Sequence, residues 1–286
     1  MALENAHGER EPLENAHGER DPAQSRSLER GLGILMTFSE TRALLGIADL
    51  SRAVELNKST THRYVATLTS LGFLQQDPET RKYRLGPRVV DLGFAAINAM
   101  EITRVAGRSL QALSDETGFT VSMAVLDGTD IVYVDRRRSV REGQLGIHLD
   151  LHVGSRLPAY CTALGKVLLA HQPADRLRDL LERTDLARRG PNTLTAREAL
   201  LTALRRVRQQ GFAVNDEELA PGLHAVAAPI RDGRGSVVAA ANVAVHLSMW
   251  NAPVETVVAR LEAPLRRTVM EISSRMGYRV PSQPSC

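Results

Sequence analysis

The sequence predicts an α+β protein: an N-terminal winged helix-turn-helix, a linker helix and a C-terminal domain built on an antiparallel sheet. Three observations carry this prediction. Three amphipathic helical segments precede a short hairpin pattern that ends before residue 87, and a long apolar helical segment follows them. Beyond it, two hairpins of long strands flank several helical segments. The chain has 286 residues, which is enough for about two hydrophobic cores.

The first two helices are predicted at 26–40 and 46–56. The apolar residues of the first recur at helical spacing: Leu28, Leu32, Leu35 and Met36. The second is short and directs Ile47, Leu50 and Val54 inward. It is therefore expected to act as the supporting helix of a helix-turn-helix.

The third helix, 58–71, is expected to be the recognition helix. Asn57 is its predicted N-cap, and Gly72 is its predicted stop. At about 100° per residue, one side collects its larger apolar residues: Tyr64, Val65, Leu68 and Leu71, with Thr60 and Thr61 at the edges. The opposite side carries short, polar or basic residues: Ser59, His62, Arg63 and Ala66. Such a face fits a DNA major groove about 12 Å wide, whereas the alternative is a solvated amphipathic helix.

A β-hairpin at 73–85 is expected to form the wing. Six basic and two acidic residues lie on the third helix and the wing with Arg88, a surplus of four positive charges that suits phosphate contact. The predicted DNA-binding residues are Lys58, Ser59, His62, Arg63, Arg81, Lys82 and Arg84.

Composition narrows the class of protein. The net charge is +3 and the pI about 9.1, too mild for indiscriminate coating of nucleic acid. Cys161 and Cys286 are far apart, and no apolar run approaches the roughly 18 residues of a membrane span. We therefore expect a cytoplasmic protein without disulfides or membrane contact. Residues 1–24 contain the octapeptide LENAHGER twice and are predicted to be a disordered tail.

The predicted domains are 25–86 for the winged helix-turn-helix, 87–106 for the linker helix and 107–280 for the second domain. The segment 87–118 is helical in pattern nearly throughout, with Gly93 and Gly107 as weak points. Its apolar residues are too many for one partner surface, so we expect contact with a second subunit in a homodimer or a dimer of dimers. A dimer would present two recognition helices to a pseudo-palindromic operator in double-stranded DNA.

The second domain is predicted to contain two hairpins, 120–137 and 225–247, which turn at Asp127–Gly128 and at 232–235. Between and after them we expect a strand at 144–149 and helices at about 162–171, 174–183, 195–210 and 254–276. Helices gathered on an antiparallel sheet leave loops that surround a small-ligand pocket.

Six ordered segments resemble the IclR-type bacterial transcriptional regulators: RSLERGLGILMTF, NKSTTHRYVATLTSLGFL, YRLGPRVVDLG, VGSRLPAYCTALGKVLLA, GFAVNDEELAPGLHAVAAPIRD and VVAAANVAVH. The similarity covers about 26 to 280 and is greatest to the branch that controls protocatechuate, 4-hydroxybenzoate and β-ketoadipate catabolism. The resemblance implies a winged helix, a linker helix, a GAF-like effector domain, and repression or activation of catabolic genes.

By the same resemblance, the effector would lie against residues that match the family's pocket: Ala163, Leu164, Asn215, Asp216, Ala225, Asn242 and Ala244. The serines typical of members that bind small keto acids are replaced by Asn242 and Ala244, and a glycine by His246. The identity of the ligand therefore does not carry over from those members, and a small keto acid stays an alternative effector.

Local chemistry favours an organic acid as effector. A helix that starts at Cys161–Thr162 offers free N–H groups and a positive dipole end, and Arg156 is expected to pair with a carboxylate nearby. Residues that would read ring hydroxyls are Tyr160, Thr162, His224, Asn242 and His246. For each of these the alternative is a structural role in the core or in a hydrogen-bonded scaffold.

Two other classes compete with a ligand-responsive regulator. In an enzyme, Cys161 at a helix N-terminus would be the nucleophile, but no base is fixed beside it in the sequence. In a metal sensor, His148 and His152 would act with Asp216, Glu217 or Glu218. The two histidines would lie about 13 Å apart on a straight strand, too far for one ion. We therefore expect no catalytic residue, no metal site and no cofactor.

Overall fold

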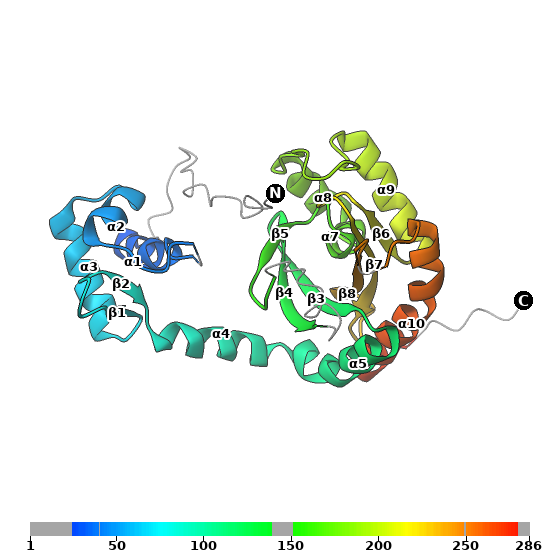
Figure 1. Ribbon diagram of the computed structural model, residues 1–286, viewed down its shortest axis with the longest axis horizontal. Coiled ribbons are helices and arrows are strands. Elements are labelled where there is room, and N and C mark those ends of the chain that lie inside the picture. The colour runs from blue at the N-terminus through cyan, green and yellow to red at the C-terminus, as the bar shows by residue number, and fades with distance from the viewer. Residues whose placement is uncertain (1–24, 40, 139–150, 249, 280–286) are drawn as a thin grey trace, which may run out of the picture. The chain divides into compact units, whose positions relative to one another are not determined.

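The computed structural model describes residues 25–39, 41–138, 151–248 and 250–279 (Figure 1). The chain divides into two compact units after Ala96. Each unit has a hydrophobic core of its own, so each is described by itself.

The N-terminal unit is a winged helix-turn-helix, as predicted. Its elements are α1 (Arg26–Met36), α2 (Ile47–Ala53), α3 (Lys58–Ser70), β1 (Leu74–Gln76) and β2 (Tyr83–Leu85). The core joins one side of all three helices to the hairpin: Ile34, Phe38, Leu45, Leu50, Val65, Leu74 and Tyr83.

Helix α3 begins where its cap predicts. The Asn57 side chain accepts a hydrogen bond from the Thr60 amide at 2.8 Å, which satisfies an N–H that has no partner inside the helix. The buried side is centred on Thr61 and Val65, and Leu71, expected to face inward, is exposed. The physical reason is that Leu71 is already the C-cap, where the chain leaves the helical rotation before Gly72 turns it at φ 79°.

Helix α1 also departs from the simplest reading of its pattern. Leu28, Leu32 and Met36 repeat at helical spacing but are exposed, whereas Ile34 is fully buried. The helix therefore carries apolar residues on an outer side as well as on the core side.

The wing is tied to the helices by backbone hydrogen bonds. Strands β1 and β2 are antiparallel, and Leu45 forms an isolated bridge with Tyr83 through two N–H···O bonds of 3.0 and 2.8 Å. At the tip, Oδ1 of Asp77 accepts from both the amide and the hydroxyl of Thr80 at 2.7 Å. The predicted turn thus has a specific side-chain lock.

The long predicted helix is two helices, α4 (Pro87–Ala99) and α5 (Glu101–Thr117). The break falls at Met100, whose ψ of 108° is extended, and not at either glycine of the segment. The Thr103 hydroxyl donates to the carbonyl oxygens of Ile97 and Met100 at 2.7 and 2.8 Å, so the interruption leaves carbonyls satisfied.

The C-terminal unit is built on a six-stranded antiparallel sheet in the order β5-β4-β3-β8-β7-β6 (Figure 1). The strands are β3 (Thr120–Asp127), β4 (Asp130–Arg137), β5 (Arg156–Pro158), β6 (Ala213–Asp216), β7 (Leu223–Arg231) and β8 (Val237–His246). Both long hairpins and their turns were predicted. The edge strands β5 and β6 were not, because three or four residues are too few to display an alternation. The predicted strand 144–149 lies outside the described residues.

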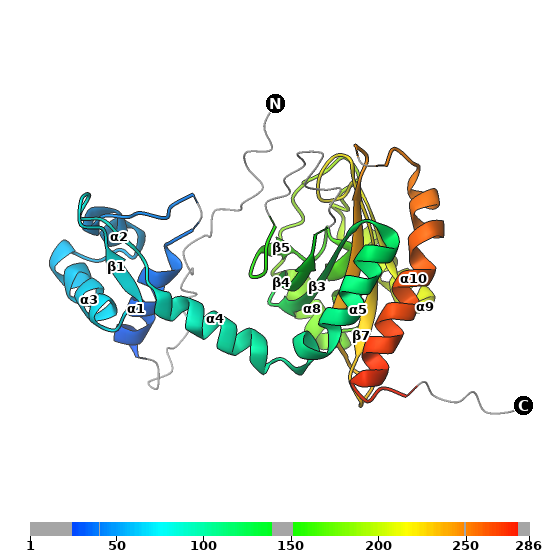
Figure 2. The ribbon, with the colours of Figure 1, turned by 60° about the horizontal axis from the view of Figure 1, so that its bottom comes forward.

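Helices cover both faces of this sheet (Figures 1 and 2). Helix α5 and the last helix, α10 (Val254–Arg275), pack on one face. The helices of the other face are α7 (Ala163–Ala170), α8 (Ala174–Glu182) and α9 (Arg197–Gln210). Alternating residues of β7 divide between the two cores, and within the described ranges no helix is long and apolar enough to cross a membrane.

Candidate nucleic-acid interface and ligand cavity

The predicted recognition face of α3 lies on the surface. Lys58, Ser59, His62 and Arg63 are exposed, and Val65 on the other side is fully buried. The core therefore fixes the rotation of the helix, and the polar residues project away from the unit. Arg63 is long enough and has the planar donor geometry to pair with a guanine edge.

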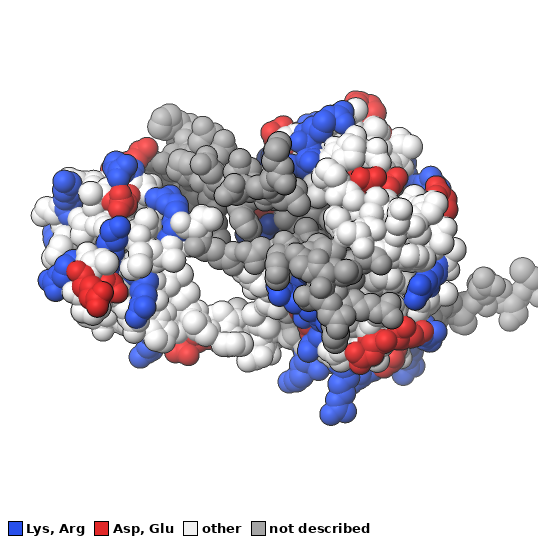
Figure 3. Space-filling model, in the orientation of Figure 1, with Lys and Arg blue, Asp and Glu red and all other residues white. Residues whose placement is uncertain are grey.

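The three basic wing residues are exposed as well: Arg81, Lys82 and Arg84. Arg81 has a positive φ of 59°, which the hydrogen-bonded turn of Asp77 supports. Figure 3 shows Lys and Arg side chains spread over the visible face of the N-terminal unit, with a smaller number of acidic ones. A recognition helix beside a basic hairpin offers base contact and phosphate contact from the same unit.

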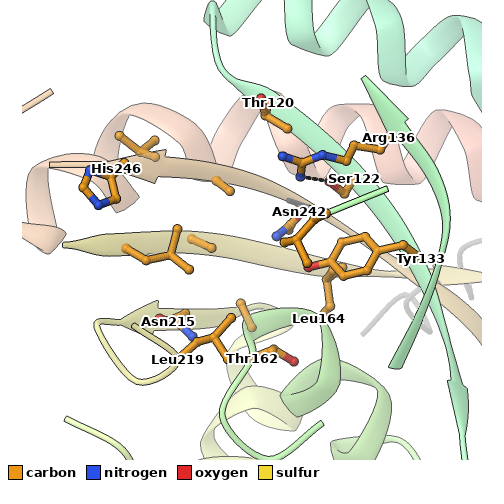
Figure 4. A pocket seen from close by; sticks show the side chains of 16 residues that line it. Thr120, Ser122, Tyr133, Arg136, Thr162, Leu164, Asn215, Leu219, Asn242 and His246 are labelled. Carbon is orange, nitrogen blue, oxygen red and sulfur yellow. Dashed lines mark hydrogen bonds between the residues drawn. The ribbon is translucent and has the colours of Figure 1, made fainter. Parts of the chain in front are cut away.

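A cavity opens in the C-terminal unit between the sheet and the start of α7 (Figure 4). Its empty volume, which includes space open to solvent, is about 630 Å³. Its lining comes from five strands, α7 and nearby loops: Thr120, Ser122, Tyr133, Arg136, Leu151, Thr162, Ala163, Leu164, Asn215, Leu219, Leu223, Ala225, Asn242, Ala244, Val245 and His246.

The start of α7 forms one wall. The Thr162 hydroxyl caps the helix by accepting from the Gly165 amide at 3.0 Å, so Ala163 and Leu164 occupy the first turn, where N–H groups have no intrahelical acceptor. Asn215 braces this wall because its side-chain amide donates to the Cys161 carbonyl at 2.7 Å and accepts from the Glu218 amide at 3.2 Å. Hydrogen bonds thus hold this wall in place, and it carries the positive end of a helix dipole.

Strand β4 supplies a guanidinium and a phenol to the cavity, and the neighbouring β3 supplies a hydroxyl. Arg136 donates to Oγ of Ser122 at 3.3 Å, and Tyr133 lies beside them (Figure 4). Burial raises the pKa of Tyr133 to about 12, so its hydroxyl stays protonated at neutral pH. Among the described residues, the opening thus combines the positive charge of Arg136 with neutral hydrogen-bonding groups.

Strand β8 contributes an acceptor without a partner. Asn242 is buried, and its Oδ1 makes no hydrogen bond to any described residue. Buried polar atoms are nearly always paired, so this oxygen calls for a donor from a bound molecule. His246 closes the same strand, with Nδ1 2.6 Å from Oγ of Ser248.

The structure brings eight of the twelve predicted effector residues to the cavity: Thr162, Ala163, Leu164, Asn215, Ala225, Asn242, Ala244 and His246. Four others lie elsewhere: Arg156, Tyr160, Asp216 and His224. The guanidinium of Arg156 instead pairs with Asp127 at 2.8 Å and Asp130 at 3.4 Å, the carboxylates that flank the β3–β4 turn. The Tyr160 hydroxyl donates to the Ala187 carbonyl at 2.6 Å within the core.

Asp216 and His224 miss the cavity because of strand alternation. They face each other across β6 and β7, one position along from the pair Asn215 and Ala225, which lines it. Successive strand residues point to opposite faces, so the neighbouring pair lies on the other face of the sheet.

Sequence reasoning missed the cavity's arginine. A register shift in the β3–β4 pairing leaves Val134 as an extra residue between Tyr133 and Asp135. This bulge resets the alternation of β4, so that Tyr133 and Arg136, three residues apart, both reach the cavity. No local pattern in the sequence marks the shift, because it depends on the partner strand.

Cys161 is fully buried and its pKa is raised to about 12, chiefly by burial. We therefore expect it to remain a thiol up to about pH 11 and to resist a disulfide reagent in the folded chain at pH 8. The measurement is thiol labelling of full-length Cys286→Ser, with the urea-unfolded chain as control. Fast labelling of the folded chain would contradict the buried thiol.

Models of two protein families match the chain. The model described as "IclR helix-turn-helix domain" matches residues 27–78, and "Bacterial transcriptional regulator IclR C-terminal" matches residues 94–274. The first match lies within the N-terminal unit, and the second spans most of the C-terminal unit.

Individual relatives agree with these models. The chain is 39% identical to the Pca regulon regulatory protein of Pseudomonas putida over 77% of its own length and 74% of that protein's. It is 35% identical to the transcriptional regulator XynR of Escherichia coli K12, over 88% of this chain and 98% of the relative. A crystal structure of an IclR homolog from Microbacterium hydrocarbonoxydans complexed with 4-hydroxybenzoate is similar with a TM-score of 0.75 and 26% identity, covering 87% of this chain and 98% of that one.

Proposed function

The chain belongs to the IclR family of bacterial transcriptional regulators, and from this premise we propose that a small carboxylic acid controls its binding to operators of catabolic genes. It is a DNA-binding regulator and not an enzyme. The proposed effector is an aromatic acid or a ring-cleavage product of the β-ketoadipate pathway, and the proposed place of action is the cytoplasm.

The observation that carries this proposal is that one cavity holds both a cation, which favours a bound anion, and a buried acceptor without a hydrogen-bond donor. Arg136 and the first turn of α7 favour a negative charge, and a carboxylate matches the planar fork of a guanidinium. The buried Oδ1 of Asn242 requires a donor, which a hydroxyl supplies. Pyruvate and β-ketoadipate have an anion but no hydroxyl, so each would leave that oxygen unpaired at a cost of about 1–3 kcal/mol. Within the proposed ligand class, Asn242 therefore favours a hydroxylated aromatic acid over the ring-cleavage product.

An aromatic or similarly apolar body fits the remaining lining, because Leu164, Leu219 and Leu223 contribute hydrocarbon surface beside the ring of Tyr133. The complex of the Microbacterium homolog with 4-hydroxybenzoate and the name of the Pca regulon protein support the same ligand class. The metal-responsive alternative is a separate possibility, because it would use residues outside the cavity.

The test is fluorescence anisotropy of labelled DNA from upstream of the chain's own gene and of the neighbouring operon. The DNA is titrated with protein alone and with 4-hydroxybenzoate, protocatechuate, β-ketoadipate, benzoate or pyruvate. We expect salt-sensitive binding that a hydroxylated acid changes and that benzoate, which lacks the hydroxyl, changes at a much higher concentration. A response to pyruvate alone would overturn the ligand class, and tight binding unaffected by every acid would do so too.

The proposed assembly is a homodimer, or a dimer of such dimers, on a pseudo-palindromic operator. Val90, Leu92 and Phe94 of α4 are 55–61% exposed, more than a solvated helix usually tolerates for large apolar side chains. The exposed Leu28, Leu32 and Met36 of α1 are further apolar surface of the N-terminal unit that a second subunit could cover. Effector binding would shift the population of conformers, and α4 would pass the change to the spacing of two recognition helices.

Arg63→Ala should weaken operator binding by about 1–3 kcal/mol, because the exposed guanidinium of α3 would no longer pair with a base edge. The measurement is anisotropy at two salt concentrations, together with thermal unfolding. Arg205→Ala, which removes an exposed arginine from helix α9, is the matched control and should leave affinity unchanged. Equal affinities of the chain and Arg63→Ala would remove α3 from the proposed interface.

A further inference from the structure

We propose that Asp216, Glu217 and His224 form a binding site for a divalent transition-metal cation where β6 turns into β7. One ligand atom from each residue lies within 4.8 Å of the other two. Asp216 and His224 lie on the sheet face opposite the cavity, because this cross-strand pair is offset by one residue from the pair that lines the cavity.

The histidine and the aspartate are already at the separation of two ligands of one ion. Nδ1 of His224 is 3.1 Å from Oδ1 of Asp216. Two atoms bound tetrahedrally to zinc at about 2.0–2.1 Å are roughly 3.3 Å apart. Only a small adjustment therefore separates the observed geometry from a coordinated one.

The contact between this ring nitrogen and Asp216 is not a well-formed hydrogen bond. His224 is only 4% exposed, yet Nδ1 makes no hydrogen bond of acceptable geometry to the part of the chain that the structure describes. A buried nitrogen in that condition is rare, and a cation supplies the missing interaction with its lone pair. The side chain of Asp216 is 43% exposed, so a hydrated ion has a route to the site from solvent.

Glu217 is held in place by its backbone and by one carboxylate oxygen. Its amide donates to the Leu223 carbonyl at 2.9 Å, and its Oε2 accepts from the Gly222 amide at 2.7 Å. A carboxylate has two oxygens, and a hydrogen bond to one orients the group for coordination through the other. Of the carboxylates that meet here, Glu217 is therefore the more firmly positioned.

The ligand set selects the class of metal. One imidazole and two carboxylates suit zinc, manganese or iron better than calcium or magnesium, which prefer oxygen alone. Three protein ligands leave at least one position for water.

In the structure, the histidine that lies beside Asp216 and Glu217 is His224 and not one of the two that the sequence suggested. His148, which the sequence paired with it, lies outside the described residues, and Nδ1 of His152 lies 2.8 Å from the carbonyl oxygen of Val153. His224 replaces them because β7 returns it to Asp216 across one strand spacing.

A metal at this turn would also bear on the cavity, an extension that rests on the proposed function. Asn215 precedes Asp216 in the chain, Ala225 follows His224, and both line the cavity. Metal and effector should then alter each other's affinity by the same factor.

The test is isothermal titration of the full-length chain with zinc chloride in the absence of any effector, so that its outcome does not depend on the effector proposal. The chain carries His7→Gln and His17→Gln to remove the histidines of the duplicated octapeptide. We expect one zinc ion per chain and an EDTA-reversible rise in melting temperature. Asp216→Asn and Glu217→Gln should each weaken zinc binding at least about tenfold.

Asp175→Asn removes a highly exposed carboxylate elsewhere in the same unit and is the matched control, with unchanged zinc affinity. His224→Gln should abolish binding, and if it does not fold, the two carboxylate variants decide. Absence of zinc binding, or binding that survives both carboxylate substitutions, would overturn the proposed site.

Discussion

Arg136→Gln should weaken binding of a carboxylate effector by about 2–5 kcal/mol, a factor of at least about 30 in Kd. Arg136 supplies the positive charge among the residues that line the cavity, and glutamine keeps much of its length without the charge. The bound carboxylate would then be desolvated without a cation. The measurement is isothermal titration with the acid that proves active in the DNA-binding assay.

Two further variants separate charge from geometry. Arg136→Lys keeps the charge but loses the planar two-donor fork. Its affinity for the effector should therefore fall between that of the unsubstituted protein and that of Arg136→Gln. Arg156→Gln is the matched control, because that arginine pairs with carboxylates at the β3–β4 turn outside the cavity. Loss of effector affinity in Arg156→Gln with full affinity in Arg136→Gln would reverse the assignment.

Lys166→Met should destabilise the C-terminal unit by about 3–5 kcal/mol. The Lys166 side chain is 6% exposed, and its ammonium forms an ion pair with Glu218 and donates to the Val214 carbonyl at 2.6 Å. Removing it leaves the buried Glu218 carboxylate without a cation. The measurement is urea unfolding followed by fluorescence of Trp250, the single tryptophan, which stacks on Phe119 in the same unit.

The loss of unfolding free energy in Lys166→Met should increase with pH. Burial raises the pKa of Glu218, and the Lys166 ammonium partly opposes that rise. A raised folded pKa means that stability falls as pH increases above the unfolded value of about 4.3. Without the ammonium the pKa rises further, so the destabilisation should be larger at pH 8 than at pH 5.

A double variant tests the cause. Lys166→Met with Glu218→Gln removes both charges and should recover most of the lost stability, because a neutral pair carries no uncompensated buried ion. Equal stability of the single and double variants would show that the loss comes from packing and not from charge.

Local patterns in the sequence predict much of the fold. Asn57 and Thr162 cap helices at the predicted starts, and Gly128 turns a predicted hairpin. These features depend on neighbours within a few residues, so periodicity and turn chemistry predict them. The break at Met100 was not accessible, because neither glycine nor proline marks it.

The sequence predicted those residues of the candidate site that lie in segments similar to the family. It could not predict residues whose position depends on contacts between distant segments. The α7 start, Asn215 and the β8 positions were predicted and line the cavity. Arg156 was predicted from nearness in sequence to the α7 start, and the hairpin's carboxylates hold it elsewhere.

The sequence by itself determined the element types, most of their boundaries, the family and the polar face of α3. The tertiary structure alone decided that Arg136 faces the cavity, that Lys166 neutralises Glu218 and that His224 meets Asp216. The reason is physical: helix and turn preferences arise within a few residues, whereas strand register, bulges and the pairing of buried charges depend on residues brought together from distant parts of the chain.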